Sequence, residues 1–455
     1  MTRSRRRFLG DLTLSAGALC WPACVEAPPE PRAPKFHWGV AVENTWMAQS
    51  DPAYDGDRRL LDEYALTEHD ERFEDDLALA RDLGVTSVRT SVPWYLSEPS
   101  PEQYDFDWFD RVIDHCLKLD LVPIVDLIHY GTPAWMETGI GDARFEASFA
   151  AYARKLGGHF RGRVSHFTPH NEPQLAALYG GALGLFPPYG QTVQRWAELG
   201  VRIARAMVLA TETLRDEVPK ARIFSAELIH WPAAEALFGT LPEEPEARDA
   251  LVLSTGSFPA SLAYGRIVAT HPLVDRLASL GVPSSELEWF TERAAPPDVL
   301  GYNHYPDLVD FAADGDFTRG GSLPLHEAAR QAADKVEQAL RRVARYFGQP
   351  VWLSETSAGL AGEARAAYAH ALGEMTDRLL ADGVPLVGLH WWPLLTAAQW
   401  RYRDEPSTPL DAFLVPGGWN NGLFDLVRDG GGGLERVATA AAEAFATMVR
   451  ERTRA

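Results

Sequence analysis

Cysteine is scarce in this sequence: only Cys20, Cys24 and Cys116 occur among 455 residues. A disulfide framework or a structural zinc site needs several Cys or His residues at characteristic spacings, and no such spacing is visible. Cys116 lies in an apolar helical setting, so we interpret it as a buried thiol. The sequence therefore predicts no disulfide framework, no metal and no cofactor.

Clusters of basic residues are also lacking in the body of the chain, whose formal net charge is −20. Binding to nucleic acid needs clustered cations that neutralise phosphates, so we exclude a nucleic-acid partner. A glycine-rich phosphate turn is missing after the first expected strand, where the chain reads Gly39-Val40-Ala41. This disfavours an open, doubly wound nucleotide-binding sheet.

The apolar run at residues 12–21 is too short to span a bilayer, as expected for a removable signal. Before it, Ser4-Arg5-Arg6-Arg7-Phe8-Leu9 resembles the twin-arginine export signal; a chance basic N-terminus is the alternative. We predict a signal segment at residues 1–27, a Pro-rich linker at 28–35 and one folded domain at 36–455. The protein is then exported, to the periplasm or the outside of the cell.

A membrane anchor would require lipidation at Cys24. The sequence Trp21-Pro22-Ala23-Cys24 lacks the Leu that lipoprotein cleavage boxes carry three residues before the Cys. A membrane-anchored lipoprotein stays an open alternative, and the sequence does not determine the oligomeric state.

Strand-like and helix-like stretches alternate from residue 36 onward. Helical stripes such as Phe149, Tyr152, Leu156 and Phe160 separate short apolar runs. We predict eight strands, at residues 36–42, 85–92, 121–128, 164–170, 221–228, 299–305, 351–355 and 385–392. Such alternation predicts parallel strands that close into a (β/α)8 barrel, with long insertions after strands five and eight.

Two glutamates stand at the ends of two predicted strands. Glu172 lies in His170-Asn171-Glu172-Pro173, and Glu355 ends the apolar run at residues 351–355. Glycoside hydrolysis uses two carboxyl groups: one protonates the leaving oxygen, and the other attacks the sugar carbon or activates a water. The alternative is that both are loop-end acids on an acidic surface.

Other strand ends carry groups suited to a sugar, and chemistry in such barrels collects at these ends. These groups are Arg89, Asp126, His129, Asn171, Asn303, Tyr305, Trp391 and Trp392. A single His at a strand end is more often structural, but with Glu355 included six strand ends agree, which favours a site.

Six motifs in order carry a resemblance to family 1 glycoside hydrolases, from residue 36 to about 426. They are Phe36-His37-Trp38-Gly39-Val40-Ala41, Arg89-Thr90-Ser91-Val92-Pro93-Trp94, His129-Tyr130-Gly131-Thr132-Pro133, Asn171-Glu172-Pro173, Gly301-Tyr302-Asn303-His304-Tyr305, and Trp392-Pro393-Leu394-Leu395 with Gln399-Trp400. The resemblance implies a retaining β-glycosidase, with a carbohydrate as its partner.

The resemblance also implies roles for single residues. Glu172 would be the general acid/base and Glu355 the nucleophile. Asn171 and His129 would bind the 2- and 3-hydroxyls of the sugar, and Tyr305 would donate a hydrogen bond to the nucleophile. The remaining implied substrate-binding residues are Arg89, Asn303, Trp392, Gln399 and Trp400. An Arg beside Glu355 would keep it ionised, whereas Glu172 must stay protonated near neutral pH.

The chain departs from the family pattern where the sugar is recognised. The family offers a Gln at the end of strand one, where the nearest candidates here are Glu43 and Asn44. It also has a Glu where this chain has Gln399. We therefore expect a neutral sugar whose outer hydroxyls are read differently, so that fucosides or xylosides rival glucosides. An endo-acting glycanase or transglycosylase of the same clan and a non-catalytic sugar-binding barrel are the alternatives.

Overall fold

The computed structural model describes residues 36–48, 58–306, 325–358, 363–417 and 419–453. The predicted signal segment and linker lie outside these residues, so those interpretations stay predictions. In the described part of the chain, no helix has the length and apolar character needed to cross a membrane.

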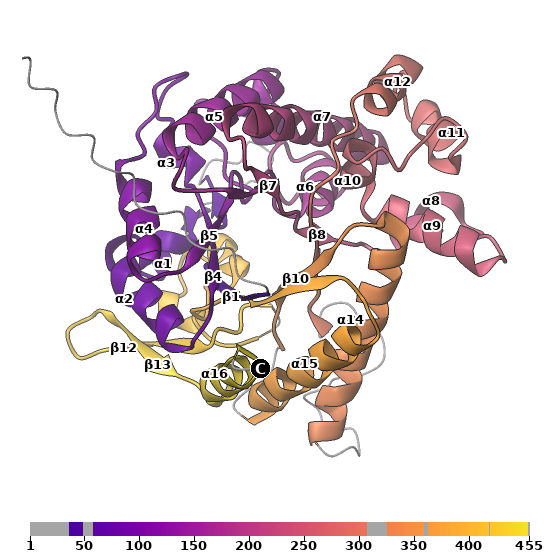
Figure 1. The fold of residues 1–455 in the computed structure, drawn as a ribbon. Helices are drawn as coiled ribbons and strands as arrows, with labels where there is room; N and C mark the ends of the chain where they lie inside the picture. The colour runs from indigo at the N-terminus through magenta and orange to yellow at the C-terminus, as the bar shows by residue number, and fades with distance from the viewer. Residues whose placement is uncertain (1–35, 49–57, 307–324, 359–362, 418, 454–455) are drawn as a thin grey trace, which may run out of the picture. The chain divides into compact units, whose positions relative to one another are not determined.

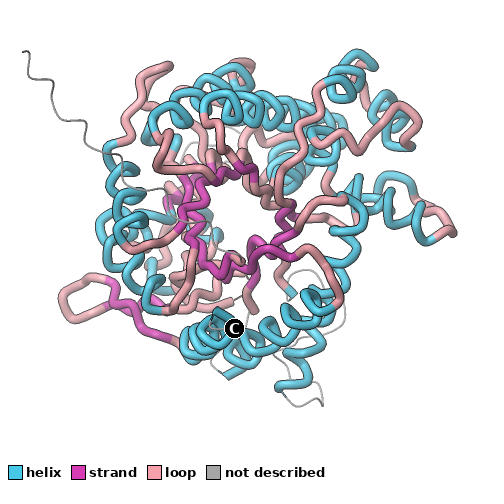
Figure 2. Tube along the Cα trace, viewed as in Figure 1, coloured by secondary structure: helices cyan, strands magenta, loops and turns pink. Residues whose placement is uncertain are grey.

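Parallel strands form a ring at the centre of the molecule (Figures 1 and 2). In the order of their pairing they are β7 (Arg222–Ile223), β6 (His166–Thr168), β5 (Val122–Asp126), β4 (Ser87–Ser91), β1 (His37–Ala41), β11 (Leu386–Trp391), β10 (Val351–Thr356), β9 (Leu300–Asn303) and β8 (Glu227–Leu228). β7 and β8 are the two ends of one irregular strand, because Phe224 between them pairs with Val299 and Ala226 with Asn171. The predicted eight-stranded barrel is confirmed.

Helices surround the ring and cover its outer face (Figure 2). They pack there because their apolar stripes face the strands; in α4, for example, Phe109, Val112, Ile113 and Cys116 are buried. The helices are α1 (Glu63–Leu66), α2 (His69–Asp82), α3 (Trp94–Ser97), α4 (Asp107–Lys118), α5 (Phe145–His159), α6 (Pro173–Ala177), α7 (Val193–Glu217), α14 (Leu325–Phe347), α15 (Glu363–Ala381) and α16 (Ala440–Thr453).

The predicted insertion after strand five is helical. It holds α8 (Ala233–Phe238), α9 (Pro245–Gly256), α10 (Phe258–Ala263), α11 (Pro272–Ser279) and α12 (Ser284–Glu292). Figure 1 shows α8, α9, α11 and α12 at the periphery, away from the strand ring. Short pieces complete the described elements: a hairpin of β2 (Trp46–Met47) and β3 (Leu61–Asp62), 3-10 turns at Gly139–Gly141, Trp400–Asp404 and Leu410–Ala412, and a π-helical turn at Leu178–Ala182.

The last helix begins later than the sequence predicts. The sequence predicts a last helix over residues 434–449, but Leu434–Ala438 forms β13, which pairs antiparallel with β12 (Phe424–Arg428). The turn between them, residues 429–433, consists of Asp429 and four glycines. The Asp429 carboxylate accepts a hydrogen bond from the backbone N–H of Gly431 at 2.7 Å. This turn folds the chain back as a hairpin, so α16 starts only at Ala440.

The floor of the barrel is filled by large side chains that point inward. Ile124, Phe224, Val299 and Trp352 form a separate buried cluster there. Histidines complete the layer: His37 makes edge contacts with His166 and Phe224, and His390 contacts Trp352. Burial lowers the pKa of His37 to about 3 and that of His166 to about 4, so these rings are neutral packing groups.

Gly301 in β9 lies so close to Ser225 in the neighbouring strand segment that a side chain would not fit. A Cβ at this position would lie 1.8 Å from the carbonyl oxygen of Ser225 and 2.5 Å from Nε1 of Trp352. We expect Gly301→Ala to lower the free energy of unfolding by about 3 kcal/mol or more, because the two backbones would have to separate. Gly430→Ala, where a Cβ meets nothing within 4 Å, is the control. Equal denaturation midpoints for both variants would contradict this packing.

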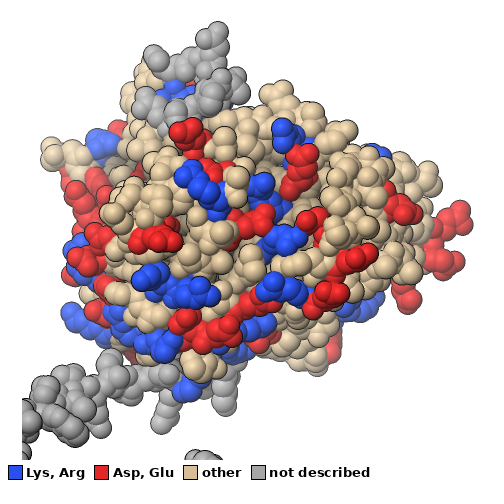
Figure 3. Space-filling model, turned by 90° about the horizontal axis from the view of Figure 1, so that it is seen from above, with Lys and Arg blue, Asp and Glu red and all other residues tan. Residues whose placement is uncertain are grey.

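Charges of both signs are interleaved on the face drawn in Figure 3. Among the ion pairs, Arg163–Asp110 (2.5 Å) links the turn after α5 to α4, and Arg342–Asp249 (2.6 Å) links α14 to α9. The side chains on this face form no basic stripe of the kind that phosphates would need.

Candidate active site

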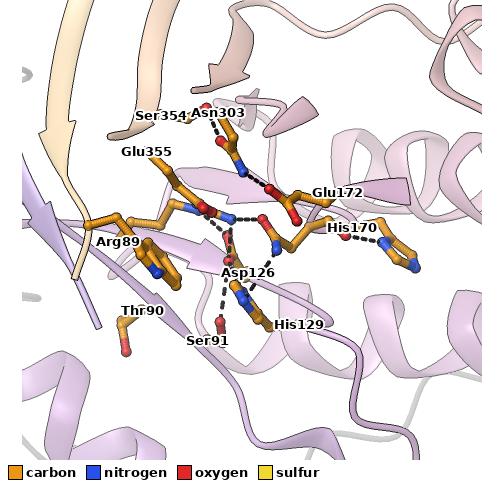
Figure 4. A network of polar contacts seen from close by, with 12 residues as sticks. Arg89, Thr90, Ser91, Asp126, His129, His170, Glu172, Asn303, Ser354 and Glu355 are labelled. Carbon is orange, nitrogen blue, oxygen red and sulfur yellow. Dashed lines mark hydrogen bonds and ion pairs between the residues drawn. The ribbon is translucent and has the colours of Figure 1, made fainter. Parts of the chain in front are cut away.

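Glu172 and Glu355 lie at the carboxyl ends of two strands of the ring, β6 and β10, which are separated by β7/β8 and β9. Glu355 is in β10, and Glu172 follows β6 as the residue that precedes α6. Both are buried, with 6% and 3% of their surface exposed, and both line one cavity of about 540 Å³. Figure 4 shows the two carboxyl groups turned toward the same space.

Glu355 is held by a cation and a phenol. Arg89 Nη1 donates to Glu355 Oε1 at 2.5 Å, and the Tyr305 hydroxyl donates to Oε2 at 2.6 Å. Arg89 is fully buried, and Asp126 fixes it through contacts of 2.8 and 2.7 Å. Each donor stabilises a charged carboxylate, so this setting suits an ionised Glu355.

Among the described residues, the hydrogen-bond donors to Glu172 are neutral. Asn303 Nδ2 donates to Glu172 Oε1 at 2.9 Å, and the Tyr130 hydroxyl donates to Oε2. Asn303 is oriented by Ser354, whose hydroxyl donates to its amide oxygen at 2.6 Å. The Glu172 backbone is in the left-handed region at φ 41°, and its N–H donates to the carbonyl of Ala226 at 2.9 Å.

The two buried carboxyl groups differ in their ion pairing, because only Glu355 of the two contacts Arg89 directly. Burial raises the pKa of both groups. The charge of Arg89 lowers the pKa of Glu355 again, while a charge on Glu172 raises it. Because a charge on either group opposes ionisation of the other, the two protons leave in separate steps. The first charge is best placed on Glu355, which has the direct ion pair.

The structure brings most of the predicted site residues together. Arg89 Nη2 donates to Asn171 Oδ1 at 2.6 Å, and Asn171 Nδ2 lies 3.2 Å from His129 Nε2. Carboxylates of Glu43 and Asp126 outweigh burial and raise the pKa of His129. The predicted residues that line the cavity are Glu172, Glu355, His129, Asn171, Tyr305, Trp392 and Trp400. Arg89 and Asn303 do not line it but bond the two carboxyl groups.

Gln399 is not brought to the cavity. Its Nε2 donates to the Val415 carbonyl at 3.2 Å, and its Oε1 accepts from Arg401 Nε at 2.7 Å. It precedes the 3-10 turn Trp400–Asp404, and this turn directs the Trp400 ring to the cavity while Gln399 faces the loop around Val415. The prediction that Gln399 reads the outer hydroxyls is corrected on this geometry.

Glu43 is the carboxylate that lines the cavity instead. Trp392 Nε1 donates to Glu43 Oε2 at 2.9 Å, and His129 Nε2 lies 3.7 Å from Oε1. The sequence indicates Glu43 as a candidate at the end of strand one, but not that its side chain would reach the cavity. The ring of Trp392 stacks on His129, with centroids 5.0 Å apart.

Tyr130 is a site residue that the sequence analysis missed. Its hydroxyl accepts a hydrogen bond from Asn171 Nδ2 at 3.1 Å and donates to Glu172. Its backbone has φ 70°, a rare value for a non-glycine residue, which is a structural mark of a functional position. The sequence signal for Tyr130 is its position directly after His129 in the motif His129-Tyr130-Gly131-Thr132-Pro133.

Comparisons with known proteins agree with this geometry. The family model for glycosyl hydrolase family 1 matches residues 57–305. Beta-glucosidase A of Thermotoga maritima is 24% identical over 360 residues, 73% of this chain and 79% of that protein. The bifunctional beta-D-glucosidase/beta-D-fucosidase of Bifidobacterium breve is 35% identical over 122 residues, 24% of this chain and 26% of that protein.

Solved structures give the same fold. The family 1 β-glucosidase from Thermotoga maritima superimposes with a TM-score of 0.68 at 20% identity and covers 92% of this chain and 98% of its own. The matched range of the family model includes Glu172 and ends before Glu355, whose position in β10 comes from the structure. The family match spans more than half of the chain: this protein belongs to glycosyl hydrolase family 1 and is a glycoside hydrolase that acts on O-glycosidic bonds.

Proposed function

We propose that Glu355 is the nucleophile and Glu172 the general acid/base in the retaining hydrolysis of β-glycosides. Glu355 attacks the anomeric carbon while Glu172 passes its proton to the leaving oxygen, and a glycosyl–enzyme ester forms. Glu172 then takes a proton from a water, whose oxygen displaces Glu355. The observation that carries this assignment is the ion pair: Arg89 contacts Glu355 and not Glu172.

The sugar itself would be held by the polar floor of the cavity. We propose that Asn171, His129 and Glu43 bind its hydroxyls and that Trp392 and Trp400 contact its faces. A carboxylate such as Glu43 accepts two strong hydrogen bonds from adjacent hydroxyls. Glucose and fucose are our proposed sugars, and the names of the relatives, β-glucosidase and β-glucosidase/β-fucosidase, support them. The endo-acting and non-catalytic alternatives are not favoured.

A panel of aryl β-glycosides tests the proposal. Protein lacking residues 1–27 should hydrolyse β-glucoside and β-fucoside and leave the α-glucoside intact. NMR should detect the β-anomer as the first product, because two displacements at the anomeric carbon restore its configuration. An α-anomer as first product would contradict a retaining mechanism, and no turnover of any β-glycoside would remove the assignment.

Tyr130 offers a test of how Glu172 is tuned. A hydrogen bond to a charged group is worth about 1.5–3 kcal/mol, and 1.36 kcal/mol corresponds to one pKa unit. Tyr130→Phe removes a donor that stabilises the Glu172 carboxylate, so the pKa of Glu172 should rise. Glu172 acts in its protonated form, so the alkaline limb of the kcat/KM profile should move up by about one pH unit.

Tyr179→Phe is the matched control for this shift. Tyr179 lines the same cavity, and its hydroxyl has no hydrogen bond to Glu172 in the described part of the structure. The control should keep the wild-type profile. An unchanged alkaline limb in Tyr130→Phe, or an equal shift in both variants, would show that the Tyr130 hydrogen bond does not set this pKa.

We also propose export as a folded protein through the twin-arginine route, on the basis of Arg5 and Arg6. The variant carrying Arg5→Lys and Arg6→Lys should accumulate as precursor inside the cell. Fractionation of cells that produce both forms measures this. Equal export of the double variant would mean that the segment does not act as a twin-arginine signal.

A further inference from the structure

The outer wall of the catalytic cavity is aliphatic, in contrast to its floor. The floor carries the two catalytic carboxyl groups together with Glu43, His129, Asn171 and Tyr305. The side chains of the outer wall carry no hydrogen-bonding groups. They are Leu175, Leu178, Leu183, Leu228, Ile229 and Pro232. One cavity thus has a polar part and an apolar part.

This aliphatic wall lies on the side of Glu172. Leu175 and Leu178 follow Glu172 in α6 and at the start of the π-helical turn. Leu228 ends β8, and Ile229 and Pro232 follow it; the carbonyl of Ala226, just before β8, accepts the Glu172 N–H. The two segments are therefore neighbours, and both begin beside the acid/base.

The position of the wall connects it to the leaving group. A general acid must lie within hydrogen-bond reach of the oxygen that it protonates. If Glu172 has the role proposed above, on which this inference rests, the group attached to that oxygen lies against the aliphatic wall. The sugar that is transferred lies toward Glu355 and the polar floor.

We infer that the leaving group of the natural substrate is an apolar aglycone with an extended hydrocarbon part, and not a second sugar. Aliphatic side chains gain from removing hydrocarbon from water. They offer no partner to the hydroxyls of a sugar, and buried hydroxyls without partners are unfavourable. Outside the polar floor, the remaining polar side-chain atoms of the described lining belong to Tyr130, Tyr179, His230, Trp231, Trp392, Trp400 and Trp419. The indole N–H of Trp231 already donates to the Tyr302 hydroxyl at 3.3 Å.

Leu183 marks the outer end of the wall. It lines the cavity and is 51% exposed, so a hydrocarbon chain that leaves the cavity would cover it. Leu185, two residues later, is 46% exposed and is not among the lining residues. The pair provides a matched set of positions: one inside the inferred path of the aglycone and one outside.

A series of alkyl β-glycosides tests the inference, with the sugar that the aryl panel favours. Methyl, butyl and octyl glycosides have leaving alcohols of similar acidity, so chain length changes mainly the contact with the wall. At concentrations below micelle formation, kcat/KM should rise at least tenfold from methyl to octyl, and the octyl glycoside should exceed the β-linked disaccharide of the same sugar. A flat series, or a disaccharide better than the octyl glycoside, would overturn the inference.

Two variants show whether the wall itself is responsible. Leu183→Gln should lower the octyl-to-methyl ratio of kcat/KM at least threefold, and Leu185→Gln should leave it unchanged. Leu185→Gln, which lies outside the inferred path, should also hydrolyse the aryl glycoside at the wild-type rate. Equal ratios in the two variants would remove the wall from the explanation. Loss of hydrolysis of every glycoside by the wild type would instead contradict the proposed function, so the two failures are distinguishable.

Discussion

Glu355→Ala should lower kcat/KM for aryl β-glycosides by about 10⁵-fold, the order of loss that follows removal of a catalytic nucleophile. Glu355 is the only carboxylate of the pair with an ion pair to Arg89, and the Tyr305 hydroxyl fixes its second oxygen. No other group in the described site is both anionic and placed to take over covalent attack. The variant should keep its fold, because the space left by the side chain opens to the cavity; a thermal melt checks this.

The stereochemistry of rescue identifies the role. Azide is small enough to occupy the space left by the Glu355 carboxylate and can attack the anomeric carbon of an activated aryl β-glycoside directly. One displacement inverts the configuration, so the product should be the α-glycosyl azide, with the phenolate as leaving group. A β-glycosyl azide would mean that a covalent intermediate still forms, and Glu355 would then not be the nucleophile.

Glu172→Ala should lower kcat/KM by about 10²–10⁴-fold for glycosides whose leaving group needs a proton, which is the usual contribution of a general acid. With a dinitrophenyl glycoside, whose phenolate leaves unaided, the first step should stay fast. The glycosyl–enzyme ester should then accumulate, because water lacks its general base in the second step. Stopped-flow measurements should show a burst of dinitrophenolate whose amplitude equals the enzyme concentration.

Azide again separates the two roles. In Glu172→Ala it should attack the accumulated ester and give the β-glycosyl azide after two displacements, and it should accelerate turnover. The contrast with the α-azide expected from Glu355→Ala fixes both assignments in one experiment. An equal loss of activity for leaving groups of every acidity would argue against proton donation by Glu172.

The sequence predicts the barrel well because each strand and helix carries its own periodic pattern. The stripe Phe149, Tyr152, Leu156 and Phe160 is buried as expected, and the eight predicted strands all take part in the ring. The hairpin at residues 424–438 was missed, because a run of glycines fixes its turn while Leu434–Ala438 reads equally well as the first turn of a helix.

The site was predictable in its centre and less so at its edge. Glu355 lies in β10 and Glu172 comes shortly after β6, so strand geometry alone places them at one end of the barrel. Gln399 lies in a long irregular segment, where neither the direction of a side chain nor its partner Arg401 follows from periodicity. Glu43 reaches the cavity because Trp392, 349 residues away, donates to it, and a contact of that range is not visible in one sequence.

The left-handed backbones of Tyr130 and Glu172 have a consequence for engineering. Each such residue costs roughly 1–3 kcal/mol when it is not glycine, and both side chains belong to one hydrogen-bonded pair at the catalytic cavity. Glycine at either position would relax the backbone, and at position 172 it would also remove a buried carboxyl group. Selection for heat tolerance alone would therefore favour loss of the catalytic acid, so directed evolution of this enzyme has to score turnover and thermal survival in the same screen.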